Sequence, residues 1–282
     1  MFGIDVAQLA KRIWADTNEH QVFGRAAQLS YYFLLALFPL LLVLVNLLGY
    51  LAQSGSQLRD SLMSYLATVM PGSSVQLVQT TLDEVSNSRG GGKLSFGLLA
   101  ALWAASNGMG AITETLNVAY DVKETRPWWK VRLVSIFLTL AVSILIVIAL
   151  VIVLYGGRLA DFLASQFGFS DVFRISWKIL QWPIALLFVL ITFHLIYYFA
   201  PNVRHRRWST PGAVVAVALW LLISFGFKLY LNFFNSYSVT YGSLGALIIM
   251  MLWFYLTGAS ILIGGELNSE LEQLDQQRMR DR

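Results

Sequence analysis

Hydrophobic residues along this chain gather into six long blocks that are separated by shorter, more polar stretches. A helix rises about 1.5 Å per residue, so it needs about 20 predominantly apolar residues to cross a hydrocarbon layer roughly 30 Å thick. Each block reaches that length, and backbone groups in lipid must pair within their own segment, which favours helices over loops or open sheet. The pattern therefore predicts an all-α membrane protein, a six-transmembrane-helix bundle. Its spans are expected at about 26–52, 94–113, 133–155, 179–200, 211–234 and 243–265.

The segments between and beyond these blocks carry weaker helical patterns. Apolar residues at helical spacing predict two amphipathic periplasmic helices in the long loop 53–93, which ends in a run of glycines before the second span. The same spacing predicts a shorter helix around 159–167 and an amphipathic N-terminal helix within 1–25. Helices of this kind are expected to lie on the membrane surface. Residues 267–282 are expected to form a charged tail.

Lys and Arg are distributed unequally over the connecting segments, with 13 of the 20 basic residues on one side and six on the other. The richer side comprises 1–25, 119–132, 201–210 and 267–282. Because the side richer in Lys and Arg is usually cytoplasmic, these segments are predicted to lie in the cytoplasm. An even number of spans then places both termini inside a bacterial inner membrane, as a multi-pass protein.

The composition excludes a water-soluble protein, because 57% of the residues are hydrophobic and only 13% are charged, whereas soluble domains carry about 25% charged residues. The chain has no cysteine, which excludes disulfides, thiolate nucleophiles and cysteine zinc sites. His20, His194 and His205 lie far apart without a carboxylate at ligand spacing, so no metal and no cofactor is expected. The net charge of +4 comes without a basic stripe interleaved with aromatic residues, so no nucleic-acid partner is expected.

The second predicted span carries a polar stripe, defined by residues at spacings i, i+3, i+7 and i+10 that share one side of a helix. Its members are Asn107, Gly110, Glu114 and Asn117. The stripe either lines a cavity or hydrogen-bonds to a neighbouring helix, and both interpretations remain open. Because exposure of such a stripe to lipid is costly, we expect neighbouring helices to shield it.

Ionisable residues near the ends of spans are further candidates for function. Glu114 and Glu266 lie about 30 Å and about 34 Å of helix beyond the starts of their spans, which predicts the cytoplasmic boundary for both. Lys228 is predicted near the outer boundary, where its stem can reach the headgroups without any functional role. The candidate substrate or gate contacts are therefore Asn107, Glu114, Asn117, Lys228 and Glu266.

The chain resembles the YihY/BrkB family of bacterial inner-membrane proteins over roughly residues 23–271. The residues that carry the resemblance are Ala26, Leu29, Ser30, Tyr31, Tyr32, Phe38, Pro39, the segment from Tyr197 to Pro201, Tyr237, Tyr241, Gly242, Gly245, Ala246, Trp253, Gly264, Gly265 and Glu266. Members were once catalogued as ribonuclease BN, a label generally regarded as mistaken, and relatives have been linked to lipid or lipopolysaccharide movement. The resemblance implies no established functional residues.

These observations favour a non-enzymatic protein that transports or flips a lipid or another amphipathic envelope molecule, with membrane lipids as its partners. The alternative is a membrane scaffold that assembles with a periplasmic or inner-membrane protein. A ribonuclease would need clustered carboxylates or a histidine pair, whereas Asp121, Glu124 and His205 form no such cluster in the sequence. Homo-oligomerisation is left undecided by the sequence.

Overall fold

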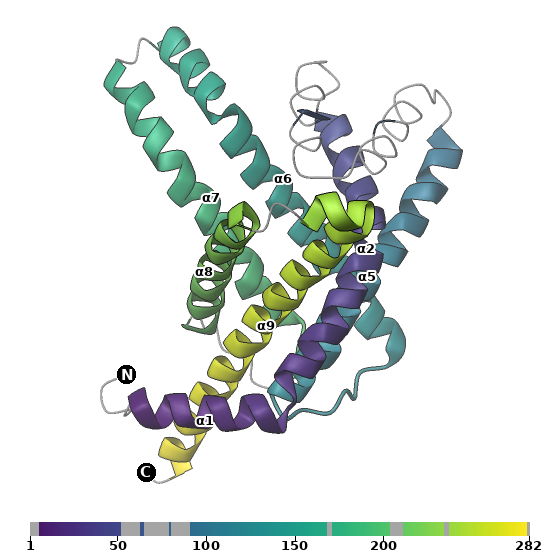
Figure 1. Ribbon diagram of the computed structural model, residues 1–282, viewed down its shortest axis with the longest axis vertical. Coiled ribbons are helices and arrows are strands. Elements are labelled where there is room, and N and C mark those ends of the chain that lie inside the picture. The colour runs from purple at the N-terminus through teal and green to yellow at the C-terminus, as the bar shows by residue number, and fades with distance from the viewer. Residues whose placement is uncertain are drawn as a thin grey trace. The chain divides into compact units, whose positions relative to one another are not determined.

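The computed structural model describes residues 6–51, 63–64, 79, 91–167, 171–203, 211–233 and 237–280, and every regular element in these ranges is a helix. The helices are α1 (Val6–Glu19), α2 (Val22–Leu51), α5 (Gly91–Ala119), α6 (Trp128–Phe167), α7 (Asp171–Phe199), α8 (Pro211–Phe233) and α9 (Tyr237–Arg280) (Figure 1). The all-α membrane class predicted from the apolar blocks is therefore confirmed.

Four helices contain segments that are long and apolar enough to cross a bilayer. These segments are Trp128–Val153, Ser176–Phe199, Pro211–Tyr230 and Leu247–Gln277. Helices α2 and α5 occupy the first two predicted spans, so the count of six spans stays a prediction for that pair. The two amphipathic helices predicted in the loop 53–93 lie almost entirely outside the described residues.

Two helices run further than the sequence pattern predicted. The separate short helix expected around 159–167 is wrong, because α6 continues without a break through Gly156 and Gly157 to Phe167. A helical glycine costs only about 1 kcal/mol relative to alanine, which is too little to end a helix of 40 residues. Likewise α9 continues for 44 residues into the expected charged tail.

The N-terminal amphipathic helix predicted within 1–25 is present as α1. It ends in a tight turn, where Gln21 adopts a left-handed backbone conformation with φ of 52° and Arg25 Nε donates to the His20 carbonyl at 2.9 Å. Trp14 is 63% exposed on this helix. Because the turn is only two residues long, α2 begins directly beside the end of α1.

The chain divides into two compact units. Unit 1 comprises Met1–Phe38, Ala104–Leu138 and Phe193–Arg282, and unit 2 comprises Pro39–Trp103 and Thr139–Thr192. Within unit 2, Gly156 of α6 lies against Gln181 and Trp177 of α7. All of the candidate contacts named from the sequence belong to unit 1.

Helix α9 forms the centre of unit 1, because glycines along it let several other helices approach closely. A Cβ atom added to Gly264 would lie 2.7 Å from the Ala216 Cβ of α8, and one added to Gly265 would lie 2.7 Å from Leu116 of α5. Gly258 faces Leu29 of α2 in the same way, at 3.3 Å. Small residues permit this backbone approach, and the C-terminal part of α9 is consequently buried from Gly258 to Glu270, apart from Ile263.

Candidate functional site

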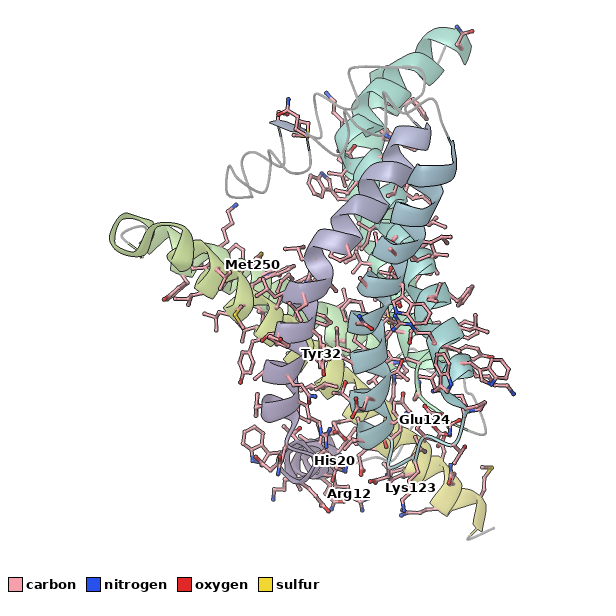
Figure 2. The ribbon with its side chains drawn as sticks, turned by 90° about the vertical axis from the view of Figure 1, so that its right-hand side faces the viewer. Arg12, His20, Tyr32, Lys123, Glu124 and Met250 are labelled. Carbon is pink, nitrogen blue, oxygen red and sulfur yellow. The ribbon has the colours of Figure 1, made fainter. Side chains whose placement is uncertain are left out.

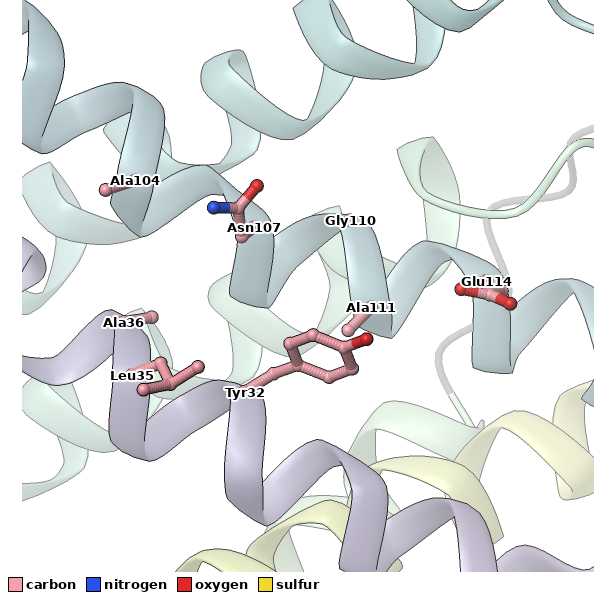
Figure 3. Close-up of a pocket in the computed structure, with 8 residues that line it drawn as sticks. All are labelled: Tyr32, Leu35, Ala36, Ala104, Asn107, Gly110, Ala111 and Glu114. Atoms are coloured by element: carbon pink, nitrogen blue, oxygen red, sulfur yellow. The ribbon is translucent and has the colours of Figure 1, made fainter.

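Three members of the polar stripe, Asn107, Gly110 and Glu114, line a cavity of about 480 Å³ that is formed by α2 and α5. Figure 3 shows Tyr32 extending from α2 toward Ala111 on α5, with Glu114 further along that helix. The full lining is Tyr32, Leu35, Ala36, Ala104, Asn107, Gly110, Ala111 and Glu114. The volume falls within the range of about 300–1,000 Å³ that is typical of small-molecule sites.

The two helices that form this cavity approach each other closely because both have small side chains where they meet. Gly108 of α5 lies against α2, so that an added Cβ would be 3.2 Å from the Ala36 Cβ. Alanine and glycine continue along the same part of α5 at Ala104, Gly110 and Ala111. The cavity lies beside this close contact, and Asn107 and Glu114 lie at its edge.

Asn107 and Glu114 are exposed in the single chain, and Leu35 beside them is 55% exposed. The expectation that neighbouring helices shield the whole stripe is therefore wrong for these two residues. The reason is that α5 buries another face, with Ser106, Thr113 and Leu116 all nearly inaccessible. Asn107, Gly110 and Glu114 thus line an open cavity, and Asn107 also contacts α6 through a hydrogen bond from Arg132.

The two ends of the cavity differ in charge. Arg132 of α6 donates from Nη1 to the Asn107 Oδ1 at 2.7 Å, which brings a guanidinium to the Asn107 end. Glu114 makes no hydrogen bond or ion pair with any residue that the structure describes. A guanidinium consequently lies behind Asn107 at one end of the cavity, and the other end presents a carboxylate.

Asn117 does not line the cavity but forms hydrogen bonds within the loop between α5 and α6. Its Nδ2 donates to the Glu124 carboxylate at 2.9 Å, and its Oδ1 accepts from the Asn202 backbone N–H at 2.7 Å. Arg126 also donates to both Glu124 oxygens, at 2.8 and 2.6 Å, and to the Ala200 carbonyl at 2.9 Å. Asn117 therefore joins this loop to the end of α7.

Glu124 is a strongly stabilised carboxylate within that loop. Its partial burial raises the pKa, but hydrogen bonds from the Arg126 side chain and backbone and from Asn117 outweigh burial and lower the pKa to about 2. A charged Glu124 accepts all of these bonds at once. The loop is thus held in one arrangement at neutral pH.

A second polar cluster, which we call the α1–α9 clamp, joins His20, Glu266, Asp121, Arg12 and Glu270. His20 Nδ1 lies 2.9 Å from the Glu266 Oε1, and its Nε2 lies 3.4 Å from the Asp121 carboxylate. Arg12 Nη1 lies 3.8 Å from Glu270. Figure 2 shows Arg12 and His20 at the end of this unit where Lys123 and Glu124 also lie.

Burial of the clamp is uneven. Glu266 is 1% exposed, whereas the side chains of His20 and Asp121 are 14% and 66% exposed. Burial lowers the pKa of His20, but the hydrogen bond and charge of Glu266 and the charges of Asp121 and Asp16 outweigh it and raise that pKa above its ordinary value. His20 is therefore held toward its charged form beside an inaccessible carboxylate.

The structure brings only some of the predicted site residues together. Asn107 and Glu114 share the cavity, Asn117 belongs to the loop network, Glu266 belongs to the clamp, and Lys228 is exposed on α8. Sequence reasoning missed Tyr32, Arg132 and His20 as partners of these residues. Spacing along one helix gives no signal for a contact such as His20 with Glu266, which are 246 positions apart.

Comparisons with known proteins place these features in a family context. A family model described as Virulence factor BrkB matches residues 13–282. A protein named Putative ribonuclease-like protein YfkH, from Bacillus subtilis, is 40% identical over 264 residues, which cover 93% of this chain and 94% of that protein. No solved structure matches the chain.

Longer relatives are found among proteins named UPF0761 membrane protein. Those from Xanthomonas oryzae and Xanthomonas campestris are 27% and 24% identical to this chain. The matches cover 92% and 94% of this chain but only 59% and 61% of the Xanthomonas proteins. The chain therefore spans about three-fifths of the length of these relatives.

Proposed function

We propose that this chain, which belongs to the family of membrane proteins described as Virulence factor BrkB, holds or moves an amphipathic, lipid-like molecule. The observation that carries the proposal is the open cavity between α2 and α5, whose lining combines polar and apolar side chains in similar measure. The proposal includes the orientation predicted from the Lys and Arg distribution, with both termini cytoplasmic in a bacterial inner membrane. Membrane lipids are the proposed partners.

An amphipathic molecule needs polar partners for its headgroup and continuous hydrocarbon for its chains. Asn107, Glu114 and the Tyr32 hydroxyl supply the polar partners at the edge of the cavity. Leu35, which is 55% exposed, provides an apolar surface beside them. A headgroup can therefore enter the cavity from the side while its chains remain in the bilayer.

The remaining candidates support the cavity indirectly in this proposal. Glu266 accepts from His20 and is almost inaccessible, so it holds α1 against α9 and does not contact a ligand. Asn117 holds the loop that leads from α5 into α6. Lys228 is exposed on α8 and remains a candidate contact for headgroups at the outer boundary.

We do not include ribonuclease activity in the proposal, although the name of the Bacillus relative contains that term. The two acidic residues that were weighed for this activity, Asp121 and Glu124, take part in ion pairs and hydrogen bonds. Asp121 lies 3.4 Å from His20, and Glu124 is bound by Arg126 and Asn117. These contacts give the two carboxylates structural roles.

The test is a lipid-scrambling assay in liposomes that contain the purified protein. Fluorescent phospholipids in the inner leaflet become accessible to a membrane-impermeant quencher only when they cross the bilayer. We expect faster loss of protected fluorescence with the wild-type protein than with empty liposomes, and a several-fold slower rate with Glu114→Gln.

Glu19→Gln is the matched control, because Glu19 is an exposed carboxylate at the end of α1 and does not line the cavity. It should scramble lipid at the wild-type rate. If folded wild-type protein moves no lipid under these conditions, the transport proposal is wrong and the scaffold alternative takes its place.

A further inference from the structure

We propose that the cavity between α2 and α5 binds a zwitterionic headgroup that carries an amine and a phosphate, as in phosphoethanolamine. The inference rests on the proposed function, because it names the chemistry of the ligand that this site would hold. The charges at the two ends of the cavity, their spacing along α5 and the side chains between them match such a headgroup.

The Glu114 end fits the amine. Its carboxylate is exposed, lines the cavity and has no cationic partner among the residues that the structure describes. A primary ammonium can donate to such a carboxylate at about 2.7–2.9 Å, and charge-assisted bonds of this kind are roughly twice as strong as neutral ones. Tyr32 lines the same cavity, and aromatic rings attract cations within about 6 Å of their centre.

The Asn107 end fits the phosphate. Arg132 Nη1 donates to the Asn107 Oδ1 at 2.7 Å, which fixes the amide so that its Nδ2 donors remain for a ligand. The guanidinium also brings a permanent positive charge to this end. An anionic group beside Asn107 is therefore stabilised by amide donors and by the charge of Arg132.

The spacing selects a headgroup in which the two charges are close together. Asn107 and Glu114 are seven residues apart, which is about 10.5 Å along a helix and brings them back to nearly the same face. Subtracting a charge-assisted contact of about 2.8 Å at each end leaves about 5 Å for the ligand. A two-carbon linker between an amine and a phosphate spans about this length.

The small residues between the two ends make room for that linker. Gly110 and Ala111 lie on α5 between Asn107 and Glu114, and Tyr32 extends toward Ala111 from α2 (Figure 3). Figure 3 shows no large side chain between Asn107 and Glu114 among the labelled residues of α5. A headgroup laid along α5 thus meets a polar group at each end, with small residues of α5 and the Tyr32 ring of α2 between them.

The experiment measures lipid binding, not transport. The purified full-length protein in detergent is titrated with phosphatidylethanolamine, phosphatidylcholine or phosphatidylglycerol of identical acyl chains, and bound lipid is counted by native mass spectrometry. We expect phosphatidylethanolamine to bind most tightly, because phosphatidylglycerol lacks the amine and the methylated amine of phosphatidylcholine cannot donate to Glu114.

Glu114→Gln should weaken phosphatidylethanolamine binding by about tenfold or more, since the amide oxygen can still accept from the ammonium but the negative charge that strengthens this bond is lost. Binding of phosphatidylglycerol should change little in the same variant. Asn107→Ala should instead weaken both phospholipids by a similar factor, because both carry the phosphate. Glu19→Gln should match the wild type throughout, and Glu114→Asp should retain part of the preference.

Soluble O-phosphoethanolamine distinguishes the two sources of this headgroup. If it displaces bound phosphatidylethanolamine and Glu114→Gln abolishes the displacement, the headgroup alone is recognised. If only the lipid binds, and its preference still depends on Glu114, the site takes the headgroup as part of a lipid. Equal binding of all three phospholipids, or a preference that Glu114→Gln leaves unchanged, would overturn the inference.

These outcomes are separable from those of the scrambling assay. Scrambling without headgroup preference would leave the proposed function standing and remove the inference about the ligand. A Glu114-dependent preference without scrambling would leave the binding site standing and remove transport.

Discussion

Glu114 and Glu266 occupy similar positions in the sequence, since each lies near the end of an apolar block. In the structure, however, Glu114 is exposed and Glu266 is buried. Glu114 is exposed at the edge of a cavity and has no partner among the described residues. Glu266 is 1% exposed and accepts from His20 at 2.9 Å. The depth of a carboxylate along its own helix therefore does not determine its role; the face on which it lies does.

The two helices explain this difference. In α9, Gly258, Gly264 and Gly265 admit neighbouring helices so closely that the polar residues after them are enclosed as well. In α5, the face that carries Thr113 and Leu116 is buried, and Glu114 lies on another face. A buried carboxylate must be paired, whereas an exposed one is free to bind a ligand.

The largest expected effect comes from removing the buried carboxylate. Glu266→Ala should lower the free energy of unfolding by about 3 kcal/mol or more, because it leaves a cavity in the buried part of α9 and takes from His20 the nearer of its two carboxylates. The measurement is thermal unfolding of the detergent-solubilised protein against the exposed control Glu19→Ala. A melting temperature equal to that of the control would contradict the structural role assigned to Glu266.

The next largest effect is expected from widening the contact between α8 and α9 that helps to bury Glu266. Gly264→Ala should destabilise the protein by about 1–3 kcal/mol, because the added methyl group would lie 2.7 Å from the Ala216 Cβ and would force α8 and α9 apart. Gly226→Ala is the matched control, since a Cβ at Gly226 meets nothing within 4 Å. Unfolding curves of the two variants that coincide would show that α9 tolerates wider spacing than the structure indicates.

The sequence predicts features that depend on residues close together in the chain, but not contacts between residues far apart in it. Each apolar block is a continuous stretch of the chain, so the helices could be predicted. The stripe that places Asn107, Gly110 and Glu114 on one face of α5 could be predicted for the same reason. The partners of that stripe come from other helices, which is why Tyr32 and Arg132 were missed. The clamp was unpredictable for the same reason, because His20 and Glu266 meet only after the whole chain has folded.

A smaller effect is expected from pH, acting on the His20 side of the clamp. The pKa of His20 is raised, so its contribution to stability is fully present below the unfolded value near 6.5 and is lost as pH rises through the folded pKa. The difference in melting temperature between wild type and His20→Gln should therefore be larger at pH 6 than at pH 9. A constant difference across this range would mean that His20 contributes by packing and not by charge.

The smallest effect on stability is expected from removing the exposed carboxylate of Glu114. Glu114→Ala should change the free energy of unfolding by no more than about 0.5 kcal/mol, as is usual for exposed positions without partners. The same unfolding measurement used for Glu266→Ala decides this. A loss comparable to that of Glu266→Ala would remove the contrast between the two residues and would indicate that Glu114 is paired.

The length of α9 has a mechanical consequence. Its 44 residues correspond to about 66 Å, roughly twice the thickness of a bilayer's hydrocarbon layer. Glu266 and Glu270 lie in the C-terminal half of its apolar segment, Leu247–Gln277, so a tilt of that segment displaces both carboxylates together with the C-terminal end of α9. That end is attached to α1 through His20 and Arg12. Movement of α9 within the membrane would thus be transmitted to a helix that presents Trp14 at its surface.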